Sequence, residues 1–80
     1  MPPANDLRSM LLNAAGVSRA EIVTALRQRG YRIARQGKHE IWSDGRGSII
    51  PVPRRLRGPG TKRAILRAMI AADREGEDDD

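Results

Sequence analysis

The sequence Ser-Arg-Ala-Glu at residues 18–21 most constrains the fold, because it fixes where a helix begins. It is a capping box, in which the Ser18 hydroxyl accepts from the backbone N–H of Glu21 while the Glu21 carboxylate accepts from the backbone N–H of Ser18. Apolar residues then recur at helical spacing. Gly30 tolerates the left-handed conformation that commonly follows a helix end. We therefore predict a helix over residues 19–29.

Three short strands are predicted after this helix, because short apolar runs there are separated by turn residues. Their ranges are 31–36, 39–43 and 48–52. The sequence Asp-Gly-Arg-Gly at residues 44–47 is a strong hairpin signal between the second strand and the third. Pro51 and Pro53 cannot donate ladder hydrogen bonds, so the third strand is expected to end early or to lie at a sheet edge.

The alternation of side chains in the middle strand allows two orientations. It places His39 with Ile41 on one face and Glu40 with Trp42 on the other, and only one pair can face the core. If Trp42 is the buried anchor, Ile41 is half exposed and His39 faces outward. Tryptophan is more often a core residue than a base-stacking one.

A second long helix is predicted near the C-terminus, with Gly60-Thr61 as its start and Thr61 as its cap. Its apolar stripe is Ile65, Leu66, Met69 and Ile70. A short helix over residues 6–15, with Gly16 as its stop, is expected to precede the rest. The predicted fold class is α+β, an α-β-β-β-α order with two helices on one face of a three-stranded antiparallel sheet.

The chain of 80 residues is long enough for one domain with a modest core. We divide it into an N-terminal extension over residues 1–17, in which 1–5 is expected to be frayed, a domain over 18–72 and an acidic, disordered tail over 73–80. No cysteine is present, no signal-peptide pattern is seen, and no apolar run approaches the roughly 20 residues that span a bilayer. A cytoplasmic protein without membrane association is therefore expected.

Charge is distributed unevenly along the chain. Residues 18–67 carry thirteen Lys or Arg against three acids, whereas residues 73–80 carry six acids and one Arg. A basic body of this density favours a polyanionic partner such as a nucleic acid. The alternative is that the basic side chains only solvate the surface. Tyr31 and Trp42 are the only aromatic residues, which argues against a stacking platform for single strands.

His39 is the only histidine, and its unperturbed pKa suits a general acid or base near neutral pH. RNA cleavage needs a group that moves the 2′-OH proton and cations that offset charge at the phosphate. Arg35, Lys38, Arg54 and Arg55 are the expected neighbouring cations. The alternative, that His39 is an ordinary surface or capping histidine, remains open at this point.

Further phosphate contacts are expected in the basic loop after the third strand and at the start of the last helix, where helical N–H groups are unpaired. These residues are Arg57, Thr61, Lys62 and Arg63. The chain has one histidine, no cysteine and few clustered carboxylates, which argues against a metal site. We expect neither a metal nor another cofactor.

A set of ordered motifs lies in a stretch that makes up about two thirds of the chain. They are Gly30-Tyr31, Gly37-Lys38-His39, Ile41-Trp42, Ile50-Pro51-Val52-Pro53-Arg54 and Gly60-Thr61-Lys62-Arg63-Ala64-Ile65-Leu66. In this order and spacing, the stretch from about residue 18 to residue 69 resembles the HicA toxins, small ribonucleases of HicA–HicB toxin–antitoxin pairs. Two departures stand out, since Lys38 replaces a frequent serine and Arg55 stands where many relatives carry a second histidine.

The resemblance implies a fold like the double-stranded RNA-binding domain and metal-independent cleavage of mRNA with His39 as the catalytic residue. It also implies a HicB-like antitoxin protein that covers this histidine and the basic face. Two other functions stay open: a non-catalytic RNA-binding module that retains the fold, and a domain that binds a partner protein.

Overall fold

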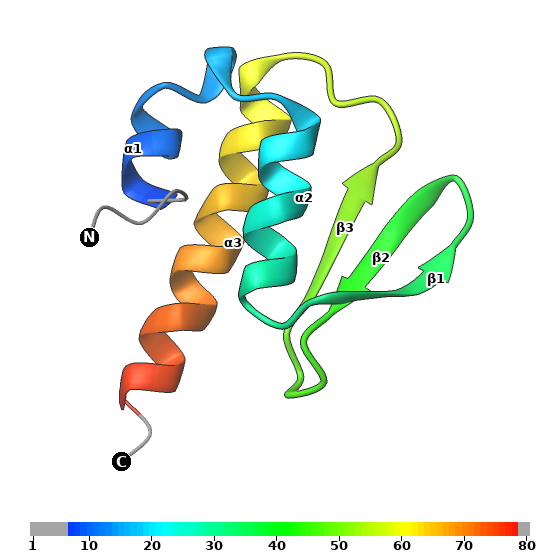
Figure 1. The fold of residues 1–80 in the computed structure, drawn as a ribbon, viewed down its shortest axis with the longest axis vertical. Helices are drawn as coiled ribbons and strands as arrows, with labels where there is room; N and C mark the ends of the chain where they lie inside the picture. Colours follow the sequence, from blue (N-terminus) through cyan, green and yellow to red (C-terminus); the bar gives the residue numbers. More distant parts are fainter. Residues whose placement is uncertain (1–6, 79–80) are drawn as a thin grey trace.

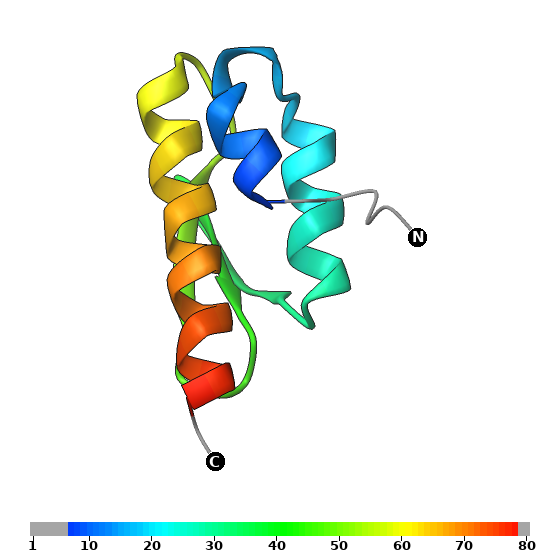
Figure 2. The ribbon, with the colours of Figure 1, turned by 90° about the vertical axis from the view of Figure 1, so that its left-hand side faces the viewer.

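The computed structural model describes residues 7–78, with side chains through residue 74. Its elements are α1 (Leu7–Leu12), the 3-10 turn η1 (Ala14–Gly16), α2 (Arg19–Gln28), β1 (Arg32–Gln36), β2 (His39–Ser43), β3 (Ile49–Pro53) and α3 (Pro59–Asp78). The strands form one antiparallel sheet in the order β1-β2-β3, and α2 and α3 lie on the same face of it (Figures 1 and 2). The predicted α+β class and α-β-β-β-α order are confirmed. The expected frayed segment 1–5 lies outside the described residues.

Helix α2 begins where the capping box predicts. The Ser18 hydroxyl accepts from the Glu21 backbone N–H at 3.1 Å, and the Ser18 backbone N–H donates to Glu21 Oε1 at 2.9 Å. At the other end, Arg29 is the C-cap and Gly30 adopts a φ of 86°. Helix C-termini commonly need this left-handed conformation, which a side chain would strain. The local sequence therefore determines both ends of α2.

The strand register decides which side of β2 faces the core. Trp42 pairs with Ile50 of β3, and both side chains are buried beneath the helices. His39 pairs with Pro53 and is exposed on the opposite face. This register confirms that Trp42 is the anchor and that His39 faces outward. The edge position predicted for the proline-containing strand is also confirmed, because β3 is the last strand of the sheet.

The N-terminal segment belongs to the same hydrophobic core as the rest of the fold. Helix α1 packs against α3, and its residues Leu7 and Met10 are buried. Ala14 and Val17 join the same cluster. The helix is shorter than the predicted 6–15, because the chain tightens into η1 after Leu12. Residues 7–17 therefore contribute to the same core in which α2 and α3 bury their apolar stripes.

Helix α3 differs from the prediction at both ends. It begins at Pro59 rather than at a Thr61 cap, since proline has a φ suited to the first helical position and Gly58 before it takes a φ of 77°. It continues to Asp78, so the backbone of residues 73–78 is helical where we expected disorder. Arg29 Nε donates to Asp73 Oδ2 at 3.1 Å and attaches this part of α3 to the end of α2. Residues 79–80 lie outside the described part.

Candidate functional site

His39 is held by the backbone of β2 while its side chain remains exposed. It is the first residue of the strand, and its carbonyl oxygen accepts from the Gly37 backbone N–H at 3.2 Å, which closes the turn from β1. Both long helices cover the other face of the sheet. The backbone of His39 is therefore fixed in a regular strand, while its imidazole remains accessible to a ligand.

A groove of about 470 Å³ runs between β3 and α3, with His39 among its lining residues. On the sheet side it is formed by His39, Ile49, Ile50, Pro51 and Pro53. On the helix side it is formed by Gly60, Thr61, Ala64, Ile65 and Ala68. The structure thus brings together His39 and Thr61, two predicted site residues that are far apart in the sequence. We name this feature the β3–α3 groove.

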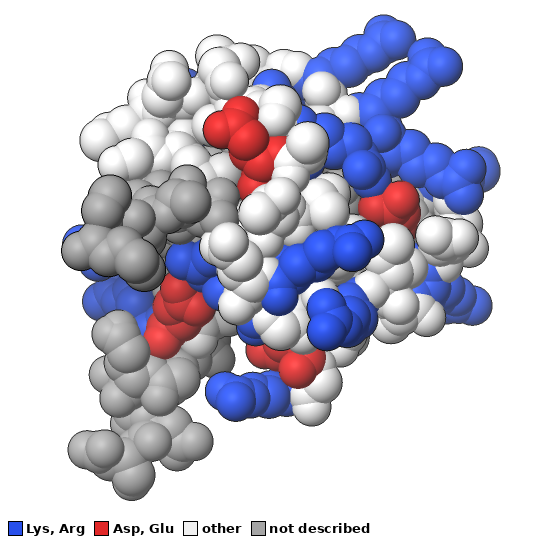
Figure 3. All heavy atoms as spheres, in the orientation of Figure 1, with Lys and Arg blue, Asp and Glu red and all other residues white. Residues whose placement is uncertain are grey.

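The predicted cations lie on both sides of His39. Lys38 precedes it in the β1–β2 turn, and Arg35 is exposed on β1 opposite Ile41. The loop from β3 to α3 begins directly after Pro53, the cross-strand partner of His39. Its exposed cations are Arg54, Arg55 and Arg57. Figure 3 shows Lys and Arg side chains gathered on the side of the molecule formed by the sheet and its loops.

The remaining predicted site residues lie in the first turn of α3, but they differ in exposure and in what they contact. Thr61 lines the groove, and Arg63 is exposed. Lys62 is half-buried and acts on Glu21 at the start of α2. The pKa of Glu21 is lowered by the hydrogen bond from the Ser18 backbone N–H, then by that with the Ser18 hydroxyl, and further by the charge of Lys62. Lys62 therefore has an acidic neighbour of its own.

A polar network on the inner side of β2 was not predicted. Glu40 accepts hydrogen bonds from the Arg19 guanidinium and, at 3.1 Å, from Trp42 Nε1. The Arg27 guanidinium lies over the Trp42 ring at 5.8 Å from its centroid. Glu40 and Trp42 are two residues apart on the strand, so the sequence indicated that they share a face. It did not indicate their arginine partners, which come from α2. This network holds β2 against α2, directly beside His39 in the sequence.

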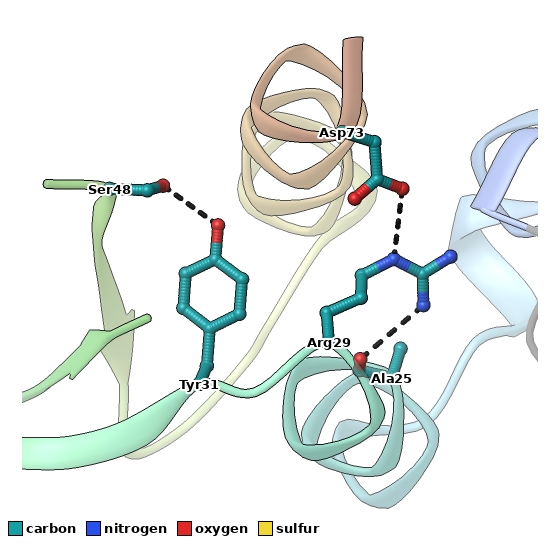
Figure 4. Close-up of polar contacts among 5 residues, drawn as sticks. All are labelled: Ala25, Arg29, Tyr31, Ser48 and Asp73. Carbon is teal, nitrogen blue, oxygen red and sulfur yellow. Dashed lines mark hydrogen bonds and ion pairs between the residues drawn. The ribbon is translucent and has the colours of Figure 1, made fainter. Parts of the chain in front are cut away.

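A second cavity, of about 520 Å³, lies among the end of α2, the β2–β3 hairpin and α3. Tyr31 Oη and Ser48 Oγ are hydrogen bonded at 2.7 Å, and Arg29 binds both Asp73 and the Ala25 carbonyl (Figure 4). Burial raises the pKa of Tyr31. Because the polar groups around this cavity bind one another, we interpret it as a structural junction between α2, the hairpin and α3. The β3–α3 groove, which holds His39, is the stronger candidate site.

No family model, curated protein or solved structure matches the chain. Among the side chains described for residues 7–74, no cluster of three or more His, Asp or Glu could hold a metal ion. Within residues 7–78, no helix has the length and apolar character needed to cross a bilayer. The residues around His39 and their geometry are therefore what indicates a function for this protein.

Proposed function

We propose that the protein is a metal-independent endoribonuclease of the HicA type, with His39 as its acid–base residue. The observation that carries this proposal is the position of His39, exposed on the sheet and lining one groove with the first turn of α3. The proposed substrate is mRNA in the cytoplasm, and the proposed partner is a HicB-like antitoxin protein. The basic loop from Arg54 to Arg57 supports a polyanionic substrate at this place.

The proposed reaction is attack of a ribose 2′-oxygen on the adjacent phosphorus, with breakage of the bond from phosphorus to the 5′-oxygen. The products are a 2′,3′-cyclic phosphate and a 5′-hydroxyl. One proton must leave the 2′-OH and one must reach the departing 5′-oxygen. His39 is the single imidazole in the chain, so it serves one of these transfers directly and water serves the other.

Negative charge at the phosphate would be offset from two directions. The helical N–H groups of Gly60 and Thr61 lie in the first turn of α3, at the positive end of the helix dipole, and both residues line the groove. Lys38 and the loop arginines supply full charges around it. No acidic side chain lies in the first turn of α3 to oppose an anion.

The test is incubation of labelled mRNA with purified protein in EDTA, read on a denaturing gel. His39→Ala and His39→Asn should both lose cleavage by roughly 10²- to 10⁴-fold, because neither side chain transfers a proton near neutral pH. Thr24→Ala, an exposed change on α2, is the matched control and should cleave like the unsubstituted protein. Equal cleavage by the His39 variants and the control would contradict the proposal.

A non-catalytic RNA-binding module is the second candidate, and it is favoured by the same exposed arginines without any role for His39. It predicts salt-sensitive RNA binding and no cleavage at any protein concentration. A gel that shows RNA shifted but uncleaved by the unsubstituted protein and by both His39 variants would select this function. If the protein binds no RNA at all, the remaining candidate function is binding of a partner protein.

A further inference from the structure

The outer edge of β3 offers hydrogen-bond acceptors but almost no donors. The Asp44 backbone N–H donates to the Ser48 carbonyl at 3.2 Å, so this pair is hydrogen bonded across the hairpin. Antiparallel pairs alternate, which makes Trp42–Ile50 and Glu40–Val52 the next hydrogen-bonded pairs in this register. The backbone groups of residues 49, 51 and 53 therefore point away from β2, toward the open edge.

Proline accounts for the imbalance at this edge. Pro51 and Pro53 have carbonyl oxygens but no backbone N–H, so of the three outward residues only Ile49 carries a donor. An added β-strand needs both donors and acceptors along its length, and this edge cannot supply them. A partner segment that extends the sheet is thus disfavoured, whereas a ligand that donates hydrogen bonds is favoured.

The walls of the β3–α3 groove are largely apolar, which suits the faces of an aromatic ring. The outward pair Pro51 and Pro53 forms one wall, and Ala64 and Ala68, one helical turn apart, form part of the other. These side chains are small, which leaves the groove open at about 470 Å³. The lining residues include no acid, while the loop at the end of the groove carries exposed arginines.

We propose that the β3–α3 groove binds an unpaired nucleobase that presents an exocyclic amino group, on the nucleotide next to the phosphate at His39. Apolar walls would contact the faces of the ring, and the outward carbonyls of Pro51 and Pro53 would accept from its amino group. Cytosine, adenine and guanine each carry such an amino group, whereas uracil has none and presents a carbonyl at the ring position of the cytosine amino group. The inference rests on the proposed function and specifies its substrate as single-stranded RNA.

The test uses the oligodeoxynucleotides (dC)5 and (dU)5, which lack the 2′-OH and cannot be cleaved by the proposed reaction. The two bases differ at C4, which carries an amino group in cytosine and a carbonyl in uracil, and at N3, which is an acceptor in cytosine and an N–H donor in uracil. The unsubstituted protein should bind (dC)5 about fivefold more tightly by fluorescence anisotropy, which corresponds to one net hydrogen bond. In amide NMR spectra, (dC)5 should shift Thr61, Ala64 and Ala68.

Two matched leucine substitutions place the binding in the groove. Ala64→Leu should fill it and remove both the preference and the shifts, whereas Ala71→Leu, also exposed on α3 but outside the groove, should keep them. Equal affinity for the two oligonucleotides would overturn the inference, as would an unchanged preference in Ala64→Leu. Should Ala64→Leu fail to fold, the comparison of (dC)5 with (dU)5 on the unsubstituted protein still decides.

The two proposals fail separately. If the cytosine preference holds but mRNA stays intact in EDTA, the base site stands and the ribonuclease function falls. If mRNA is cleaved in a His39-dependent way without any preference between (dC)5 and (dU)5, the function stands and the base site falls.

Discussion

The two faces of β2 differ in what their side chains contact, although the residues alternate within five positions. On the inner face, Trp42 is 1% exposed and Glu40 is ion-paired with Arg19. On the outer face, His39 is exposed and Ile41 is only half-buried. The inner residues have their contacts within the fold, whereas His39 lines an open groove.

This difference separates stability from function along one strand. A change on the inner face removes packing or a buried polar partner and should lower the free energy of unfolding. A change at His39 removes no core contact, so it should alter chemistry while the fold persists. Because both sets lie on the same backbone, the inner network also keeps the outer residues in place.

The largest expected effect comes from truncation of neighbouring apolar side chains on opposite faces. Trp42→Ala should lower the free energy of unfolding by about 3–5 kcal/mol, because it leaves a large cavity beneath α2. Ile41→Ala should cost about 1 kcal/mol, since Ile41 is only half-buried. Urea unfolding followed by circular dichroism measures both. Similar losses of unfolding free energy in the two variants would contradict the claim that only the inner face of β2 is part of the core.

A smaller effect is expected at Glu40, where the inner face is polar. Glu40→Ala should lower the free energy of unfolding by about 1–3 kcal/mol, because the Arg19 guanidinium and Trp42 Nε1 lose their acceptor. Glu40→Gln retains an oxygen for Trp42 Nε1 and should cost less. If Glu40→Ala were as stable as the unsubstituted protein, the network would not hold β2 to α2.

The smallest expected effect is a pH dependence at Glu21, which lies outside both faces of β2. Its folded-state pKa is lowered from 4.5 chiefly by the Ser18 backbone N–H, so its contribution is present above pH 4.5. That contribution is lost as the pH falls through the folded-state value. Glu21→Gln lacks this titration, so the urea midpoints of the two proteins should converge on acidification. A constant difference down to about pH 3 would contradict the assignment.

Much of the fold was predictable because its signals are local. The capping box at Ser18 and the conformational freedom of Gly30 determine α2 within one residue. The Asp-Gly-Arg-Gly hairpin is observed, with Asp44 Oδ1 accepting from the Arg46 and Ser48 backbone N–H groups. The start of α3 was predicted three residues late, because a helix capped by Thr61 would begin at Lys62, whereas Pro59 takes the first helical position.

The sequence by itself determined the order of elements, the excess of positive charge in the body and His39 as the only histidine, since these depend on composition and on interactions within a few residues. Tertiary structure alone decided that Trp42 faces the helices and that His39 shares a groove with Thr61. Strand alternation allows either face of β2 to be buried, and only packing against α2 and α3 selects one. The groove exists because β3 and α3 pack side by side, a contact that depends on the whole core.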